Sequence, residues 1–174
     1  MTTVNDIKEI HKGRTFTLYT ENVTLDNGVT ADIDVIRHPG ASVILPLIND
    51  TIVMIYQYRH AVGKYIYEIP AGTLNKGESP LECAKRELME ETGYTASHFE
   101  KMGEIIPVPG YSDELLHLFL AQNLSVKERN LDKDEVLSVK EFKVDKVFEM
   151  VAKGEIVDAK TLVALYFFRS AREH

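Results

Sequence analysis

Hydrophobic and polar residues alternate in the first part of the chain. Aspartates and apolar side chains alternate from Asp32 to Val35, as expected for a strand with one solvent-exposed face. Asp26-Asn27-Gly28 precedes this run and is a strong signal for a hairpin turn. We therefore expect an antiparallel hairpin built from residues 16–25 and 29–38. An isolated hairpin is only marginally stable in water, so this one should pack on the main domain or on a second subunit.

After Pro39-Gly40 the pattern becomes almost continuously apolar. The runs SVILPLI (42–48) and IVMIYQY (52–58) flank Asn49-Asp50 and are typical of strands that are buried on both faces. We expect further strands at residues 65–70, 100–106, 115–121 and 136–144, and a charged loop at 125–135. Pro39-Gly40 is the predicted boundary between an N-terminal arm, residues 1–40, and a main domain, residues 41–174.

A helix is expected between Ser79 and Gly93 because both of its ends carry signals. Ser79, Pro80 and Glu82 make an N-terminal capping box, and Gly93 suits a left-handed residue after the last turn. Two more helices should close the chain, one at residues 145–153 and one capped by Asp158. Because strands and helices interleave, the predicted class is mixed α/β, with a sheet packed between helices.

Three carboxylates of this first helix share one face. Glu87, Glu90 and Glu91 stand at i, i+3 and i+4, and at about 100° per residue they point the same way. Like charges at this spacing repel each other. Two interpretations follow from the spacing alone: a solvated acidic face, or a cage for a hard divalent cation such as Mg²⁺. The neighbouring face should pack inward through Leu81, Ala84 and Leu88.

The stretch GTLNKGESPLECAKRELMEETGY, residues 72–94, resembles the Nudix box of the Nudix hydrolase family. The positions that the box fixes are held here by Gly72, Glu78, Arg86, Glu87, Leu88, Glu90, Glu91 and Gly93. The one departure is Tyr94, which stands where an aliphatic residue is usual. The resemblance implies the Nudix fold, in which a mixed β-sheet lies between α-helices.

The resemblance also implies roles for these residues. The expected metal ligands are the carboxylates of Glu87, Glu90 and Glu91 and the carbonyl of Ala71, with Glu87 and Glu91 also expected to act in catalysis. Mg²⁺ is the expected cation, and Mn²⁺ a substitute for it. The expected structural residues of the box are Gly72, Glu78, Arg86 and Gly93.

Motifs outside the box are similar to those of the branch that acts on ADP-ribose and nucleoside-diphosphate sugars. They are Gln57-Tyr58-Arg59, Pro70-Ala71-Gly72 and Pro109-Gly110, although Tyr111 lies near a position that marks dinucleoside polyphosphate hydrolases. By this resemblance Arg59, Gly110 and Glu114 contact the substrate. The general base should be Glu135, on a loop before the last strand, with Asp134 and Glu114 as the next candidates.

The expected activity is Mg²⁺-dependent hydrolysis of the diphosphate bond of ADP-ribose, which gives AMP and ribose 5-phosphate. One alternative is a nucleoside-diphosphate-sugar hydrolase acting on GDP-mannose or ADP-sugars. Another is a Nudix-like module that senses such a ligand without cleaving it, although all the box carboxylates are present here. The resemblance further implies a homodimer with exchanged N-terminal arms.

Composition and charge narrow the remaining classes of function and location. A chain of 174 residues suits one domain with a sizeable core, and a net charge of −7 argues against binding to nucleic acid or to an anionic membrane. The single cysteine, Cys83, forms no internal disulfide and points to a reducing compartment. We find no long apolar run and no apolar core of a secretory signal, so the expected location is the cytoplasm.

Overall fold

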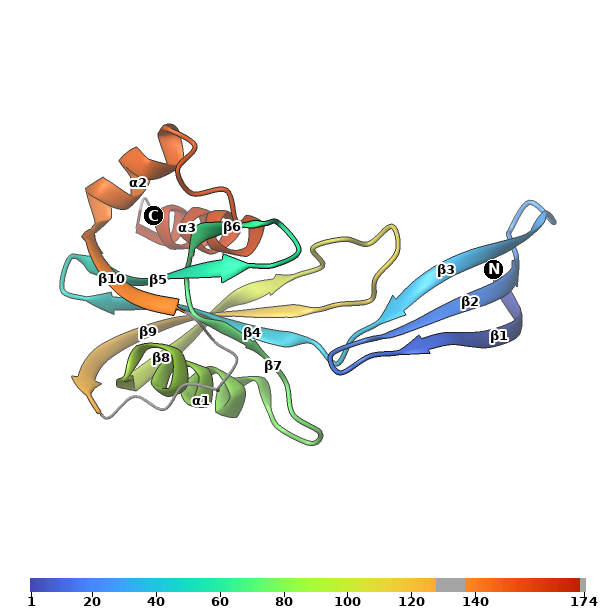
Figure 1. Cartoon of the computed structure of the whole chain (residues 1–174), viewed down its shortest axis with the longest axis horizontal. Helices are drawn as coiled ribbons and strands as arrows, with labels where there is room; N and C mark the ends of the chain where they lie inside the picture. Colours follow the sequence, from blue (N-terminus) through green and yellow to red (C-terminus); the bar gives the residue numbers. More distant parts are fainter. Residues whose placement is uncertain (128–136, 173–174) are drawn as a thin grey trace.

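The computed structural model describes residues 1–127 and 137–172. Its first three strands form a separate antiparallel sheet in the order β1-β2-β3, with β1 at Thr3–Lys12, β2 at Thr17–Thr24 and β3 at Thr30–Arg37. We call this sheet the arm, because it projects from the rest of the molecule and carries the N-terminus at its far end (Figure 1). The hairpin expected from the Asp26-Asn27-Gly28 turn is confirmed as β2 and β3.

Strand β1 was not expected from the sequence, and its geometry explains why. Two register irregularities interrupt its pairing with β2, one between Val4 and Asp6 and one between Glu9 and His11. Each bulge inserts an extra residue. Val4 and Ile7 therefore lie opposite Val23 and Glu21, on the same face of the sheet, although they are three positions apart in the sequence. The alternation that identifies a strand is lost.

The arm has one polar face and one apolar face. On the polar face, side chains hydrogen-bond across the strands: Thr20 donates to Asp34 at 2.7 Å, and Asn22 donates to Asp32 at 2.6 Å. The register places Val4, Ile7, Tyr19, Val23, Ile33 and Val35 on the other face, which we call the apolar face of the arm. Glu21 and Arg37 also lie on this face, where they pair with each other. Ile7 is 55% exposed there.

The main sheet has seven strands. The path runs β10-β5-β4-β9-β8, with β6 paired to β5 and β7 paired to β4. Their bounds are Ala41–Ile48 for β4, Thr51–Arg59 for β5, Lys64–Glu68 for β6, Ala71–Thr73 for β7, Tyr94–Ile105 for β8, Leu116–Val126 for β9 and Leu137–Lys143 for β10. Strands β4 and β9 pair in parallel and the other neighbouring strands of this sheet, as far as the structure describes them, pair antiparallel, which confirms the expected mixed sheet.

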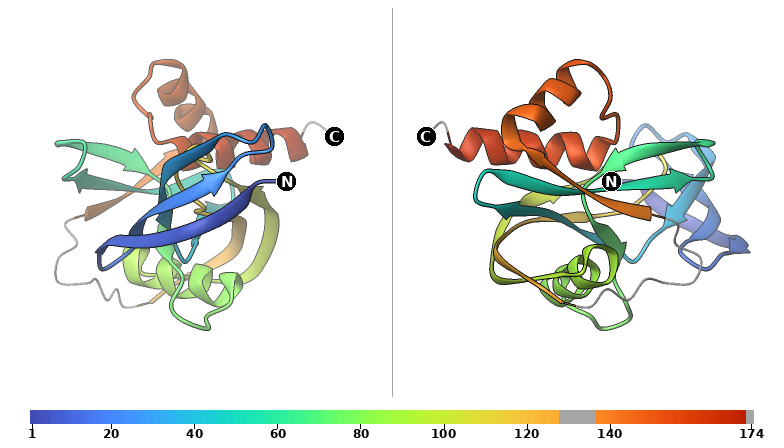
Figure 2. Two further views of the ribbon diagram at one scale, coloured as in Figure 1. Left: turned by 90° about the vertical axis from the view of Figure 1, so that its right-hand side faces the viewer. Right: turned by 60° about the vertical axis from the view of Figure 1, so that its left-hand side comes forward.

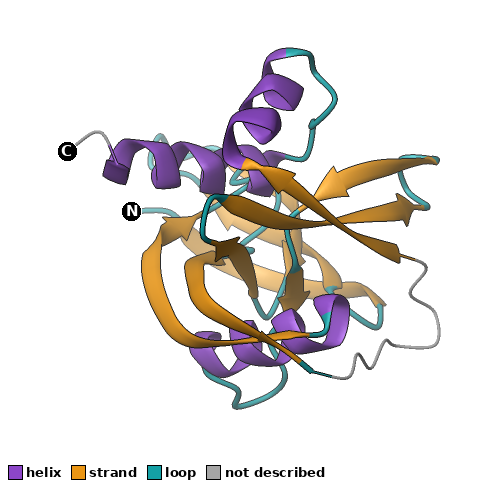
Figure 3. Cartoon of the chain, turned by 90° about the vertical axis from the view of Figure 1, so that its left-hand side faces the viewer, coloured by secondary structure: helices purple, strands orange, loops and turns teal. Residues whose placement is uncertain are grey.

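Helices cover both faces of this sheet. Helix α1 (Pro80–Thr92) lies on one face, and α2 (Val144–Ala152) and α3 (Ala159–Arg172) lie on the other (Figures 1 and 3). Strand β4 is buried on both faces, as its apolar run predicts: Ile44 packs with Ala84 and Leu88 of α1, and Leu45 belongs to the larger core beneath α2 and α3. Leu81 was expected to point inward but is 38% exposed, because it lies at the end of the helix where the packing begins.

Two strands are longer than the sequence suggested. Strand β8 begins at Tyr94, directly after α1, and β9 continues through Ser125 and Val126 into the segment expected to be a loop. The ring of Tyr94 packs against the core under α1, and its hydroxyl donates to Glu141 of β10 at 2.7 Å. The ring of Tyr94 thus makes the apolar contact that the usual aliphatic residue of the box would make, and its hydroxyl links β8 to β10.

The arm is fixed to the main domain at one end. The amide of Ile36 donates to the carbonyl of Tyr111 at 2.7 Å, and Asp113 accepts from the amide of His38 at 2.8 Å and from Arg37 at 3.2 Å. The loop between β8 and β9 therefore sets the direction in which the arm leaves the body, which Figure 2 shows end-on. Within the described ranges, no helix is both long and apolar enough to span a membrane.

Candidate active site

The ends of α1 are fixed as the sequence predicts. The hydroxyl of Ser79 accepts from the amide of Glu82, whose carboxylate accepts from the amide of Ser79 at 3.0 Å, and Gly93 adopts a left-handed conformation with φ of 75°. A capping box of this kind contributes about 1 kcal/mol to helix stability. It also fixes the rotation of the helix, so that its carboxylates face strand β7.

Gly72 in β7 lies directly against Glu87. A Cβ atom built on Gly72 would stand 1.8 Å from Oε1 of Glu87, so no larger residue fits while that carboxylate stays in place. The φ angle of Gly72 is not in the left-handed region, so it is this close approach, not the backbone conformation, that requires glycine.

Arg86 holds the carboxylates of the box in position. It donates to both oxygens of Glu78 at 2.8 and 2.9 Å, to Glu90 at 3.0 Å, to Glu87, and to the carbonyl of Thr73 at 3.1 Å. These hydrogen bonds, together with one from the Asn75 amide, lower the pKa of Glu78 to about 2. Glu78 is therefore anionic at neutral pH beside this guanidinium.

Glu91 is the most deeply buried of the three candidate ligands, at 2% exposed. Its Oε2 accepts a hydrogen bond from the amide of Ala71 at 2.9 Å, which fixes the peptide between Pro70 and Ala71. Buried carboxylates are costly, and two of them on one helix face are costlier still. A divalent cation would offset that cost, so the donor set fits a hard metal ion such as Mg²⁺.

The side chains do not yet form a ready-made metal cage. Among residues 1–127 and 137–172, no three His, Cys, Asp or Glu side chains lie close enough together to hold an ion. Arg86 draws Glu87 and Glu90 toward itself, and Glu91 faces the Ala71 amide. The same residues can hold a cation once these carboxylates turn from the arginine toward it, with Arg86 then keeping its two bonds to Glu78.

Arg59 ends strand β5 at the rim of this site. Its Nε and Nη2 lie 2.8 and 2.7 Å from Oε2 of Glu68, a carboxylate that is only 3% exposed. Burial alone would lower the pKa of Arg59, but the hydrogen bonding of its guanidinium to Glu68 and the charge of that carboxylate more than offset this, and the net effect is a raised pKa. The arginine is charged, and its side chain is 38% exposed.

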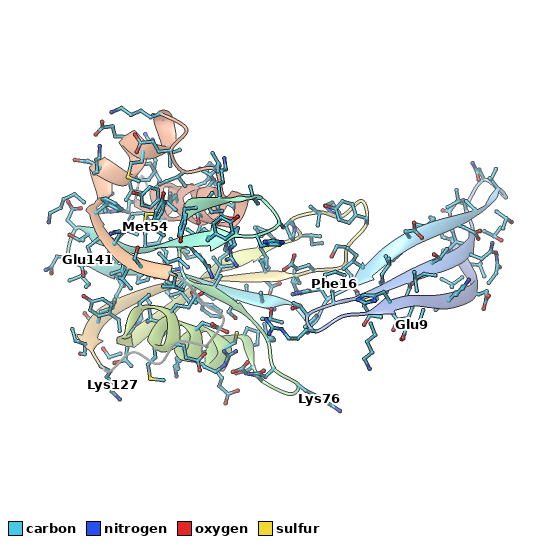
Figure 4. All side chains as sticks on the ribbon, in the orientation of Figure 1. Glu9, Phe16, Met54, Lys76, Lys127 and Glu141 are labelled. Atoms are coloured by element: carbon cyan, nitrogen blue, oxygen red, sulfur yellow. The ribbon has the colours of Figure 1, made fainter. Side chains whose placement is uncertain are left out.

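The cleft consists of two chambers that meet at Arg59. The metal chamber, about 630 Å³, contains Glu87, Glu90 and Glu91, together with Arg86 and Lys76. The second chamber, about 340 Å³, is lined by Pro107, Glu114, Leu116, Asp158 and Lys160. Arg59, Ala71, Gly72 and Thr73 line both chambers. Lys76 lies at the outer tip of the loop that follows β7 (Figure 4).

Several residues that line the cleft were not predicted, among them three from segments far from the box. Arg14 and Thr15, in the turn between β1 and β2, line the metal chamber; Phe16, the next residue, marks this turn where the arm meets the body in Figure 4. Lys160 lines the second chamber from the first turn of α3. No local motif identifies them, because their relevance depends on packing between distant segments.

The remaining predicted residues fall in three places. Glu114 lines the second chamber, where its Oε1 lies 3.6 Å from Nδ1 of His38. Gly110 is exposed in the loop that anchors the arm and is not among the residues that line either chamber. Glu135 and Asp134 lie outside the described residues.

The contact between Gly72 and Glu87 gives a direct test of the metal chamber. In Gly72→Ala the new methyl group should push the Glu87 carboxylate aside without disturbing the backbone, because the atoms it meets are the end of a side chain. We expect the variant to stay folded but to lose at least about tenfold in Mn²⁺ affinity by calorimetry, since a cation site tolerates little displacement of its ligands.

Gly28→Ala is the matched control for this test. Gly28 has φ of 81° with open space around it, so alanine there strains the turn without touching the cleft. It should lower the melting temperature and leave metal affinity unchanged. Equal metal affinity in Gly72→Ala and wild type would show that metal binding does not depend on the position that Glu87 takes against Gly72.

Comparison with known proteins places this geometry in a family. The model of the NUDIX domain matches residues 37–165. An "ADP-ribose pyrophosphatase" of Bacillus subtilis is 41% identical over 165 residues, and a "Methanol dehydrogenase activator" of Bacillus methanolicus is 39% identical over the same length; each match covers 93% of this chain and 89% of the relative. A "GDP-mannose pyrophosphatase" of Yersinia enterocolitica is 33% identical over 91% of this chain and 86% of its own.

A solved structure described as "Crystal structure of ADP compounds hydrolase" superimposes with a TM-score of 0.87, covering 99% of this chain and 94% of that chain at 22% sequence identity. At that identity the likeness concerns the fold alone. The domain model, however, spans more than half of the chain, and relatives above 30% identity cover nearly all of it. The chain therefore belongs to the NUDIX family.

Proposed function

We propose that the protein hydrolyses the diphosphate bond of ADP-ribose to give AMP and ribose 5-phosphate, with Mg²⁺ as its cation. The observation that carries this proposal is the two-chamber cleft. A diphosphate joins two separate groups, and here one arginine and the edge of strand β7 lie between two chambers of unequal size. The diphosphate would lie at Arg59, with one group on each side.

The residues around the junction have complementary tasks. Arg59 presents a planar guanidinium, which suits the oxygens of a diphosphate. Glu87, Glu90, Glu91 and the Ala71 carbonyl would hold the cation, while Arg86 and Gly72 keep that face in register. A bound divalent cation neutralises phosphate charge and makes water more acidic. Water then adds across the phosphorus–oxygen bond, leaving one phosphate on each product.

A panel of substrates tests the activity. With Mg²⁺ saturating, we expect kcat/KM to be highest for ADP-ribose among ADP-ribose, ADP-glucose, GDP-mannose, NADH and diadenosine tetraphosphate. The name of the Bacillus subtilis relative supports this order, and that of the Yersinia enterocolitica relative makes GDP-mannose the chief competitor. Glu91→Gln should lose most of the turnover while remaining folded, because it removes a charge from the buried face.

The outcomes of the panel are distinct. If GDP-mannose is preferred to ADP-ribose, the class is correct and the substrate is wrong. If the wild-type protein binds these compounds without cleaving any of them, the protein is a ligand-sensing module. If Glu91→Gln turns over at the wild-type rate, the metal assignment is wrong.

We also propose Glu135 as the general base. The box carboxylates would be engaged with the cation or with Arg86, so a separate carboxylate is needed to accept a proton from the attacking water. Glu135→Gln should lower kcat by about 10²–10⁴-fold across the pH range, the usual size of a general acid–base contribution. Glu114→Gln and Asp134→Asn are the comparisons. A Glu135→Gln loss below about tenfold, with a larger loss in either comparison, would reassign the base.

We propose further that the protein is a homodimer in which each arm contacts the other subunit. The outer strands of the apolar face of the arm are exposed: Val4 is 49% and Ile7 is 55% exposed on a sheet that projects from the body, whereas Val23 in the central strand is buried. Exposed apolar side chains gathered on one surface are typical of a protein–protein contact. A second copy of the chain supplies one at equal concentration.

Charge placed on the apolar face should separate the subunits. Ile7→Asp combined with Ile33→Asp should halve the mass measured by light scattering at micromolar concentration, because burying two carboxylates in an apolar interface is costly. Thr20→Lys is the control: it adds a charge to the polar face, opposite Asp34, and should leave the mass unchanged. A wild-type protein that is monomeric and fully active would contradict the dimer.

A further inference from the structure

The first turn of α3 is bonded to the segment that leads into the metal chamber. Asp158 caps the helix by accepting the amide of Thr161 at 3.0 Å and its hydroxyl at 2.6 Å. The same hydroxyl accepts the amide of Ile69 at 3.0 Å, and both residues are fully buried. The backbone between Glu68 and Ala71 is therefore fixed from α3 on one side and from Glu91 on the other.

Lys160 adds a charged contact to this junction. Its ammonium group donates to Oε1 of Glu68 at 2.8 Å and to Oδ1 of Asp158 at 2.9 Å, and its side chain is 15% exposed. Glu68 thus lies between two cations, with Lys160 on one carboxylate oxygen and Arg59 on the other. Two cations and two carboxylates balance within this buried group, which makes its burial tolerable.

The two carboxylate oxygens of Glu68 have different partners, and this determines how Arg59 is held. An arginine that faces a carboxylate usually places one nitrogen on each oxygen. Here Nε and Nη2 both lie on Oε2, because Oε1 is occupied by Lys160. The guanidinium is thereby kept to one side of the carboxylate. Neither contact uses Nη1, and the side chain remains 38% exposed where the two chambers meet.

We propose that Lys160 is a positioning residue for substrate binding, which acts by holding Oε1 of Glu68 so that the outer edge of Arg59 faces the diphosphate. The inference rests on the proposed function, in that the ligand at Arg59 is a diphosphate. Without Lys160, both oxygens of Glu68 are available to Arg59. The guanidinium then rotates to form a bidentate ion pair with both oxygens of Glu68, and its outer edge no longer faces the cleft.

The role is one of binding, so the expected signature is a change in KM without a change in kcat. Lys160→Met should raise KM for the best substrate of the panel about tenfold and leave kcat within about twofold. The Kd of a non-hydrolysable α,β-methylene analogue of ADP-ribose, measured by calorimetry, should rise by the same factor. Lys160→Arg should restore most of the loss, because its guanidinium can still donate to Glu68.

A double-mutant cycle with Arg59 separates positioning from direct contact. If Lys160 acts only through Arg59, then Lys160→Met should add less than about twofold to Kd in an Arg59→Met background. The same tenfold rise in both backgrounds would overturn the proposal and show that Lys160 contacts the ligand itself. A lower melting temperature with unchanged Kd would also overturn it, leaving Lys160 a purely structural residue.

Two further measurements complete the design. Lys146→Met, which breaks a 3.2 Å pair with Glu149 on the surface of α2, is the matched control and should change neither KM nor Kd. Lys160→Gln keeps a donor for Glu68 and stands in if the methionine variant does not fold; it should show a smaller rise in Kd, and no rise would overturn the proposal. If the wild-type protein neither binds the analogue nor cleaves any compound of the panel, the proposed function itself is wrong, and this result precedes any measurement on a variant.

Discussion

One guanidinium makes the acidic face of α1 stable. Glu87, Glu90 and Glu91 lie on consecutive turns of one helix, where like charges repel and burial is costly. Arg86 compensates by bonding Glu87, Glu90 and Glu78 at once, and the Ala71 amide takes up Glu91. Strand β7 can approach this face only because Gly72 has no side chain. The position of β7, and with it the junction of the two chambers, depends on this group of contacts.

Most of the fold and the centre of the site could be predicted because their signals are local. The capping box, the left-handed Gly93, the continuous apolar run of β4 and the fixed residues of the box each lie within one short stretch of sequence. Local signals fail where geometry departs from its period or where residues meet from far apart. Two bulges removed the alternation of β1, and Lys160 is 92 positions away from Glu68.

The arm and the main domain are each incomplete in a different way. The arm has a polar face that satisfies its own hydrogen bonds and an apolar face on which Val4, Ile7 and Ile33 remain exposed. The metal chamber, in turn, is closed on one side by Arg14 and Thr15 from the arm. The segment that links the arm to the body is therefore also part of the wall of the cleft, and a change in the direction of the arm alters the shape of the site.

The contact between α3 and Ile69 makes the cleft depend on a helix that follows the box in the sequence. Chains emerge from the ribosome N-terminus first and begin to fold as they do so. The box and most of the strands are then available early, but the hydroxyl that fixes Ile69 belongs to Thr161, in the last helix. A nascent chain can thus hold its acidic helix while the strand opposite it is still loose. The segment that leads into strand β7 gains its contact with α3 only after that helix has emerged and packed.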